Sequence, residues 1–488
     1  MAINIRNLDA CIRDIRAALS SPTAPPISFD HYVNDYSMLL QDLRVSQTHL
    51  PFAYQDGVVI PFISYLRRLG DAYFYEIFKT PDPQLTEHEK FLKQIIPDIS
   101  LAILIVNSNT DRLAAFAFQE VVSDLYDGFL SEEDRAGKIT GRPINPPDRG
   151  TLAPLIKWGN PESGPYTWPI SATSLLGLKA AIVSLPPAYI GRGLFAWSTL
   201  GHETGGHDIL HADTGLIQEL GRRVYNAVYN ELKFIANEAT SKALANYWVN
   251  CVDETASDVL GILNIGPAAG IGLVGYFKGL MGGRLRNYGP LKGPHPVDIL
   301  RAFVAAEVVR RLSFRLGMEW SETIERTALG DLADRKIYLL EGNRRYAIDP
   351  SLAIRTARIA ARVITNNPIN ALEGHALIEI QDWTEHDEEI ANAIGNCLIR
   401  EGTNLPQDYR GSGFYAAHVV AAATVEALKE GANIMAIFNQ MKRFLAVMHE
   451  DNISWERLIF TIRDLGLRYE PEPAPFEPET TGIPAEFK

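Results

Sequence analysis

The sequence predicts a mainly α-helical α+β fold with a small mixed β-sheet near the middle of the chain. Apolar residues recur every three or four positions through much of residues 1–140, and again from residue 194 almost to the end. This is the spacing of amphipathic helices. Only Pro165–Ile190 combines β-branched and aromatic residues with the Gly and Pro that punctuate strands. We therefore expect helical regions before and after a central sheet.

The first expected region, residues 1–140, is helical. Thr86, with His88 and Glu89 after it, is a typical helix start. The clearest helical spacing lies in three segments: Tyr32–Leu43, Ile60–Ile77 and Phe91–Val106. The sequence GRPINPPDRG over residues 141–150 contains too many helix breakers to continue a helix, so it predicts a boundary.

Three further regions follow this boundary. Residues 150–310 contain the strands and the motifs described below, and residues 311–468 return to helical spacing. The last region, residues 469–488, is rich in proline and glutamate. Such a composition cannot bury a core, so we expect an extended or disordered tail.

Composition excludes several classes of protein. The chain has 46 Lys and Arg against 59 Asp and Glu, a net charge of −13 that repels phosphate backbones and argues against nucleic-acid binding. Three cysteines are too few for a disulfide framework. The N-terminus lacks the apolar segment of a signal peptide, and no apolar run is long enough for a membrane span. These features predict a cytoplasmic protein.

The chemistry of the chain centres on the sequence STLGHETGGHDILHAD, which contains His202, His207 and His211. Histidines clustered with acidic residues on one helix are typical of metal sites, and Glu203 follows His202 as in the HExxH motif. Here the two histidines are five residues apart rather than four. On a regular helix such residues point about 140° apart. A one-residue π-bulge restores a common face, and Gly205 and Gly206 favour the distortion.

A third ligand is expected from VDETASDVLG, about 47 residues further on. Glu254 and Asp258 lie four residues apart, on one face of a predicted helix. Glu254 can complete a His/His/Glu set that leaves a fourth position to water. Asp258 can then accept a hydrogen bond from the far nitrogen of a ligand histidine.

A rival assignment stays open at this point. His207 and His211 have the ideal spacing of four residues, and Asp208 or Asp213 can join them in a metal site. This set explains the spacing, but it leaves Glu203 without a role.

The motif His202-Glu203-x-x-Gly206-His207, followed by Glu254-x-x-x-Asp258, resembles the HEXXGH zinc peptidases of the dipeptidyl-peptidase III family. More broadly, it resembles the gluzincins. The resemblance covers about 60 residues and implies a zincin-like catalytic core. It implies that His202, His207 and Glu254 bind one Zn²⁺ per chain, that Glu203 activates water, and that Asp258 orients a ligand.

Two flanking segments extend the resemblance. Many zincins carry an edge strand before the metal helix, and Leu178–Phe195 lies in that place, where it can pair with an extended substrate. Downstream, GPHPVDILR resembles the His-Pro segment of membrane-associated CAAX-type gluzincins. We expect His295 first, and Tyr288 second, to stabilise the oxyanion, and Arg301 to bind substrate.

The expected function is therefore zinc-dependent hydrolysis of a peptide or protein substrate, with Glu203 as the general base. Two alternatives remain: a zinc-binding scaffold or interaction protein without proteolysis, and a zinc hydrolase of a non-peptide amide.

Overall fold

The computed structural model describes residues 3–21, 23, 25, 27–107, 111–130, 144–145, 147–149, 152–161, 164–332, 336–400, 402, 404–406, 409, 413–452 and 455. The expected tail over residues 469–488 lies outside them. Within the described part the chain is mainly helical and contains two small mixed sheets, which confirms the α+β class. No described helix is both long and apolar enough to cross a bilayer.

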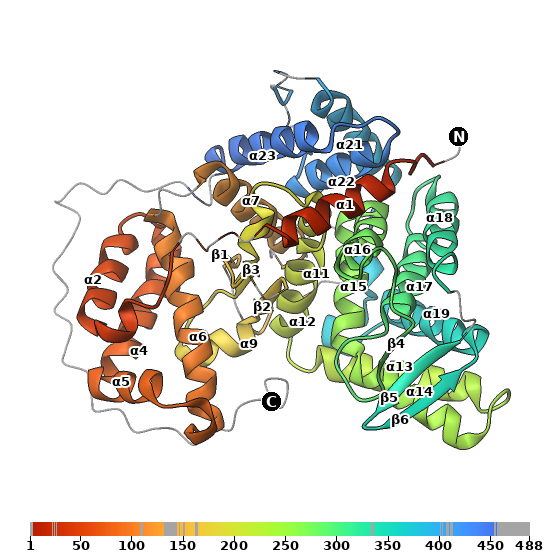
Figure 1. The fold of residues 1–488 in the computed structure, drawn as a ribbon, viewed down its shortest axis with the longest axis horizontal. Helices are drawn as coiled ribbons and strands as arrows, with labels where there is room; N and C mark the ends of the chain where they lie inside the picture. The colour runs from red at the N-terminus through yellow and green to blue at the C-terminus, as the bar shows by residue number, and fades with distance from the viewer. Residues whose placement is uncertain are drawn as a thin grey trace.

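A small group of N-terminal helices has its own core (Figure 1). It consists of α2 (Tyr36–Gln47), α4 (Ile60–Leu69), α5 (Asp71–Lys79) and α6 (Glu87–Leu104). α6 begins after Thr86, as predicted. The Thr86 hydroxyl accepts a hydrogen bond from the backbone N–H of Glu89, and the Glu89 carboxylate accepts one from the backbone N–H of Thr86. The expected helix Ile60–Ile77 is divided at Gly70, whose φ of +78° belongs to the left-handed region that glycine tolerates.

The first sheet lies between this group and the rest of the molecule (Figure 1). It contains β1 (Leu155–Trp158), β2 (Tyr166–Trp168) and β3 (Ile182–Leu185) in the order β1-β3-β2. β3 is parallel to β1 and antiparallel to β2. The prediction that Leu178–Phe195 supplies a free edge strand is therefore wrong, because both edges of β3 are paired. The edge strands of this sheet are β1 and β2.

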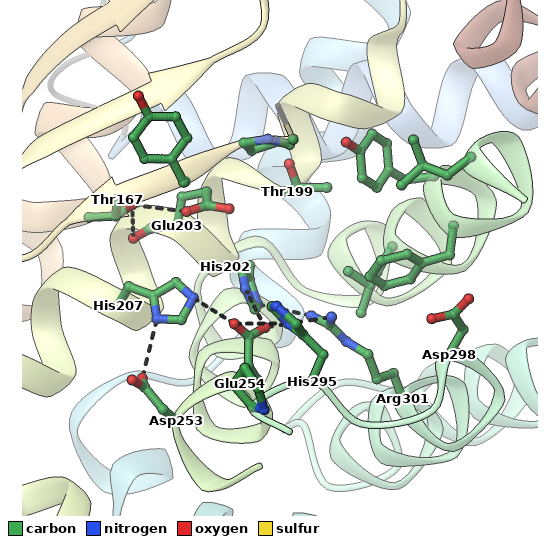
Figure 2. A pocket seen from close by; sticks show the side chains of 18 of the residues that line it. Thr167, Thr199, His202, Glu203, His207, Asp253, Glu254, His295, Asp298 and Arg301 are labelled. Atoms are coloured by element: carbon green, nitrogen blue, oxygen red, sulfur yellow. Dashed lines mark hydrogen bonds and ion pairs between the residues drawn. The ribbon is translucent and has the colours of Figure 1, made fainter. Parts of the chain in front are cut away.

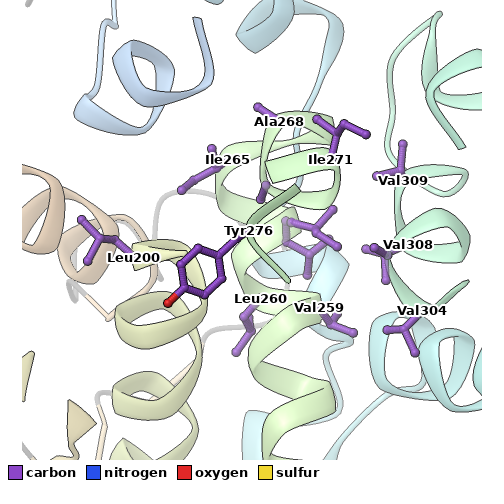
Figure 3. Close-up of a cluster of buried hydrophobic side chains, with 14 of the residues drawn as sticks. Leu200, Val259, Leu260, Ile265, Ala268, Ile271, Tyr276, Val304, Val308 and Val309 are labelled. Atoms are coloured by element: carbon purple, nitrogen blue, oxygen red, sulfur yellow. The ribbon is translucent and has the colours of Figure 1, made fainter. Parts of the chain in front are cut away.

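A larger core fills the remainder of the described chain. Its centre is α15 (Val252–Ile265), which lies between α11 (Leu200–His202) and α17 (Asp298–Val309). Figure 3 shows Leu200 on one side of α15 and Val304, Val308 and Val309 on the other. α1 (Leu8–Leu19) and α7 (Arg112–Leu130) pack in this larger core, so the described helices of the first expected region are divided between two cores.

The remaining helices surround these elements. The segment Gly215–Val249 forms two helices, α13 and α14, separated by residues 233–237. The other α-helices are α3 (Phe52–Tyr54), α9 (Ile170–Thr173), α10 (Leu194–Ser198), α12 (Ile209–Ala212), α13 (Leu216–Leu232), α14 (Glu238–Asn250), α16 (Pro267–Leu280), α18 (Gly317–Leu329), α19 (Pro350–Asn366), α20 (Leu377–Ile380), α21 (Glu385–Leu398), α22 (Ala416–Leu428) and α23 (Ile434–Glu450). The π-helices are η2 (Gln55–Val59) and η7 (Glu203–Asp208).

A second sheet was not predicted. It contains β4 (Tyr288–Pro290), β5 (Ile337–Glu341) and β6 (Arg344–Ile348), with β5 parallel to β4 and antiparallel to β6. β6 is exposed along most of its length, so it lacks the alternation of apolar and polar residues that marks a half-buried strand. The two-residue turn Gly342-Asn343 between β5 and β6 was the available signal for this hairpin.

A buried polar cluster joins the small group of helices to the first sheet. Asp98 on α6 forms an ion pair with Lys157 on β1, and it also accepts hydrogen bonds from Tyr166 and Trp168 on β2. Burial lowers the pKa of Lys157, while the carboxylate of Asp98 opposes that shift. The cluster therefore fixes β2 against α6.

Asp98→Asn should lower the free energy of unfolding by about 3–5 kcal/mol, because it leaves the Lys157 ammonium buried without its counter-charge. Glu430→Gln is the control, since it breaks an ion pair with Arg6 whose side chains are 74% and 66% exposed. That change should cost less than about 1 kcal/mol. Urea unfolding of the two variants measures both values. Equal losses would show that the Asp98 cluster contributes no more than a surface pair.

Candidate metal centre

The candidate site lies where the segment from α11 to α12 crosses α15, and the two backbones are very close together at this crossing. A Cβ atom at Gly261 of α15 would lie 2.9 Å from the backbone of Gly201 and His202. One at Gly206 would lie 2.4 Å from Cα of Ser257. Only small residues permit helix backbones to approach this closely. The crossing brings the histidines of one segment against the acidic residues of the other.

The predicted π-type widening is confirmed. Residues Glu203–Asp208 form the π-helix η7 between α11 and α12. Because a π-helix has more residues per turn, His202 and His207 come to the same side of the segment although they are five residues apart. Their ring centroids lie 4.8 Å from each other.

Three side chains converge on one point, as the sequence predicted. Nε2 of His202 lies 3.4 Å from Oε2 of Glu254, and Nε2 of His207 lies 3.5 Å from Oε1. One ligand atom from each residue falls within 4.8 Å of the others. Ligands about 2.0–2.1 Å from a tetrahedral ion are separated by about 3.3–3.4 Å from each other. The set therefore fits a metal ion, and it is the metal-type cluster found among the described residues.

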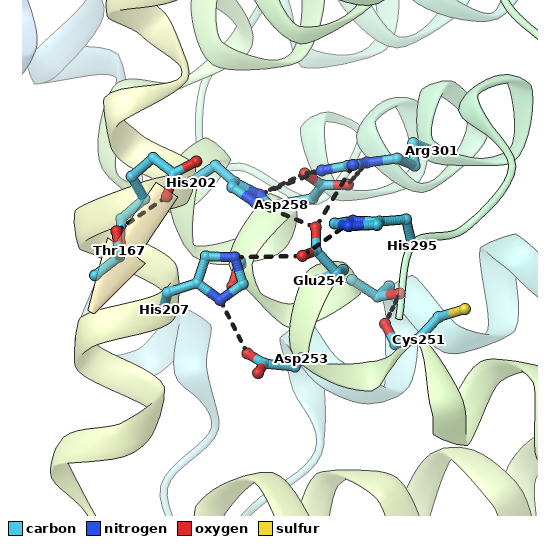
Figure 4. Close-up of polar contacts among 12 residues, drawn as sticks. Thr167, His202, His207, Cys251, Asp253, Glu254, Asp258, His295 and Arg301 are labelled. Carbon is cyan, nitrogen blue, oxygen red and sulfur yellow. Dashed lines mark hydrogen bonds and ion pairs between the residues drawn. The ribbon is translucent and has the colours of Figure 1, made fainter. Parts of the chain in front are cut away.

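In both His202 and His207, the ring nitrogen Nδ1 contacts a carboxylate (Figure 4). Asp258 accepts a hydrogen bond from Nδ1 of His202 at 2.8 Å, as predicted. Asp253 lies 3.2 Å from Nδ1 of His207. Such partners fix the tautomer that leaves Nε2 free for an ion. Asp253 was missed in the sequence, where the available signal was an acidic residue directly before Glu254.

Arg301, predicted to bind substrate, lines the cleft and is also paired within the chain. Its Nε and Nη2 donate to Asp258 at 2.8 and 2.7 Å, and Nη1 lies 3.6 Å from Glu254. The guanidinium is thus turned towards carboxylates of the chain. These contacts give Arg301 a positioning role towards Asp258, and its contact with substrate stays a prediction.

The rival ligand set is not brought together. His211 turns Nε2 towards Asp253 at 3.1 Å, so His207 and His211 share one carboxylate. Asp208 is buried and accepts a hydrogen bond from the backbone of Ile170. Burial raises the pKa of Asp208 to about 7, which disfavours its ionised form. His207 therefore turns Nε2 towards Glu254, which it shares with His202, and Nδ1 towards the carboxylate that it shares with His211.

His295 and Tyr288 differ in their relation to the site. Nδ1 of His295 lies 3.1 Å from Oε1 of Glu254, and its side chain is 64% exposed in the cleft. Tyr288 is half exposed on β4 and is not among the residues that line the cleft. Tyr288 pairs with Tyr338 through β4 and β5. Its role as a second oxyanion donor stays a prediction, to which the lining of the cleft adds no support.

The centre opens into a cleft of about 580 Å³. Residues 164–169, which include β2, form one wall. Leu273, Tyr276, Phe277 and Leu280, at helical spacing on α16, also line the cleft. Figure 2 shows Glu203 beside Thr167 on one side of the histidines, with Glu254 and His295 on the other. Glu203 is only 5% exposed and lines this cleft.

The electrostatics of the centre suit a cation. Burial lowers the pKa of His202, but hydrogen bonds with Asp258 and Glu254 outweigh it and raise the pKa above its ordinary value. Burial raises the pKa of Glu254, and hydrogen bonds from three histidines hold it well below the usual range. Without an ion, protons on the imidazoles therefore compensate the carboxylates. A metal ion can replace those protons.

Comparison of the chain with protein-family models, with curated proteins and with solved structures finds no match.

The short helix crossing generates a stability prediction. Gly206→Ala places a methyl group 2.3 Å from Cβ of Ser257, so the helices must separate. We expect a loss of about 1–3 kcal/mol or more in the free energy of unfolding.

Gly205→Ala is the matched control, because its Cβ would meet the side-chain amide of Asn264 at 3.0 Å, and that amide can move. The helix propensity of alanine partly offsets this contact. Urea unfolding midpoints should therefore rank wild type and Gly205→Ala above Gly206→Ala. The reverse order would show that the crossing is not tightly packed at Gly206.

Proposed function

We propose that this protein is a zinc-dependent metallopeptidase of the gluzincin type. The observation that carries the proposal is the set His202, His207 and Glu254, with a carboxylate behind each histidine and Glu203 in the adjoining cleft. Two imidazoles and one carboxylate, with room for a fourth ligand, are a donor set typical of catalytic zinc. The HEXXGH-type motif supports the same assignment.

The residues of the chain divide the work of hydrolysis. His202, His207 and Glu254 would hold the zinc ion, which when bound would supply Lewis-acid polarisation of the scissile carbonyl and a lowered pKa of water. Glu203 takes the proton of the attacking water and delivers it to the leaving amine nitrogen. His295, exposed in the cleft, donates to the developing oxyanion. Asp258 and Asp253 hold the imidazoles in the tautomer that binds the ion.

The cleft favours a peptide over a compact amide. β2 pairs with β3 on one edge, and the segment 164–169 lines the cleft. An unpaired strand edge offers backbone groups to an extended chain. The apolar residues of α16 that line the same cleft can bury substrate side chains.

Purified protein should contain one zinc per chain, measured by inductively coupled plasma mass spectrometry. His202→Ala, His207→Ala and Glu254→Ala each remove one of three ligands, so zinc should be lost. His211→Ala is the matched control, because His211 contacts Asp253 and is not one of the three proposed ligands. This variant should retain zinc. Loss of zinc in His211→Ala together with its retention in Glu254→Ala would instead support the rival set.

Glu203→Gln should lower kcat for peptide hydrolysis by about 10²–10⁴-fold while the zinc content stays unchanged, because the amide keeps the shape but cannot take a proton. If the protein only binds its partners, wild type and Glu203→Gln should both show no peptide cleavage. The measurement is steady-state cleavage of a quenched fluorescent peptide library.

His295→Ala should lower kcat by about 10²–10³-fold with little change in KM, since it acts on a charge that exists only in the transition state. Tyr288→Phe is the comparison, and it should leave kcat unchanged because Tyr288 lies outside the cleft. If only KM rises in His295→Ala, this residue binds substrate instead.

A further inference from the structure

Thr167 contacts the side chain that we propose as the general base. Its Oγ1 lies 2.9 Å from Oε2 of Glu203 and 3.0 Å from the backbone oxygen of the same residue. The hydroxyl is the donor, since a carboxylate and a carbonyl only accept, and its single proton is shared between these two acceptors. Glu203 is 5% exposed, so a protein donor replaces much of the water that would otherwise solvate its carboxylate.

The position of Thr167 is fixed by the strand on which it lies. Successive side chains of a strand point to opposite faces. Tyr166 and Trp168 reach Asp98 on one face of β2, whereas Thr167 reaches Glu203 on the other. Lys157 donates to Tyr166 at 2.7 Å across the intervening strand, and both residues are in register with Ser184 of β3.

The strand therefore connects two layers of the molecule. Asp98 belongs to α6 of the small core, and Glu203 belongs to η7 of the metal centre. The ion pair between Asp98 and Lys157 is buried, and a buried pair with additional hydrogen bonds has little freedom to rearrange. Thr167 thus presents its hydroxyl from a rigid element, which is the requirement for orienting another side chain.

We propose that Thr167 is a positioning residue for Glu203, and that its hydroxyl holds Oε2 so that Oε1 faces the attacking water. This inference rests on the proposed function for its catalytic consequence, but the contact itself is testable without turnover. A general base must lie within hydrogen-bond reach of the proton that it removes. Without the hydroxyl, the Glu203 side chain can adopt other rotamers, and fewer molecules hold the productive geometry.

The test uses Thr167→Val and Thr167→Ser in the full-length zinc-loaded protein. Valine keeps the branched shape and suits a strand, but it has no hydroxyl. Serine keeps the hydroxyl. Thr365→Val is the matched control: Thr365 is a buried threonine on α19 that donates to the backbone of Ala361, and it does not line the cleft.

Thr167→Val should lower kcat by about 10–100-fold, the usual loss when a partner that orients a reacting group is removed. KM and zinc content should stay at their wild-type values. Thr167→Ser should restore most of kcat, and Thr365→Val should match the wild-type kcat.

A second readout needs no activity. Urea midpoints of Thr167→Val, Glu203→Ala and the double variant form a cycle. If the contact exists, Thr167→Val should lower the midpoint less when Glu203 is already alanine. If wild-type protein cleaves no peptide, the proposed function fails and this cycle alone decides the contact. Wild-type kcat in Thr167→Val, an additive cycle, or loss of zinc in Thr167→Val would each overturn the positioning role.

Discussion

The close crossing of the α11–η7–α12 segment with α15 is the constraint on which the site depends. At Gly201 and Gly261 the two backbones touch with no side chain between them, and at Gly206 the backbone meets Ser257. This approach places the faces that carry His202 and His207 directly against the face that carries Glu254. Helices at the usual separation of about 8–10 Å would leave these side chains too far apart to share an ion.

The crossing also creates an electrostatic difficulty, because it gathers carboxylates in a buried region. Asp253, Glu254 and Asp258 lie within six residues of one helix; Glu254 and Asp258 are buried, and Asp253 is partly buried. Arg301 pairs with Asp258 and lies close to Glu254, and the histidines contact all three. Clustered buried carboxylates are unfavourable without such partners. The proposed zinc ion would supply the remaining positive charge where the imidazoles and Glu254 meet.

The sequence predicted the polar part of this site better than its packing. His202, His207, Glu254 and Asp258 were found because ligands follow spacing rules that survive folding. The distortion of the helix followed from the same spacing. The contact of Gly206 with Ser257 could not be predicted from the sequence. A helix crossing depends on how two segments far apart in the chain pack, and the spacing within one segment does not reveal it. For the same reason β1 and the strand order β1-β3-β2 escaped prediction, and β3 was expected at an edge.

The partners in the centre are far apart along the chain. The contacts of Asp258 with His202, Asp253 with His207, and Arg301 with Asp258 join residues separated by 56, 46 and 43 positions. Such contacts form only after long loops have closed, so they belong to the late part of folding. An ion that needs all of them binds the native state and not the unfolded chain. Its binding free energy then adds to native stability in proportion to the logarithm of its concentration. In that case the unfolding temperature of this protein should rise with the concentration of free metal ion.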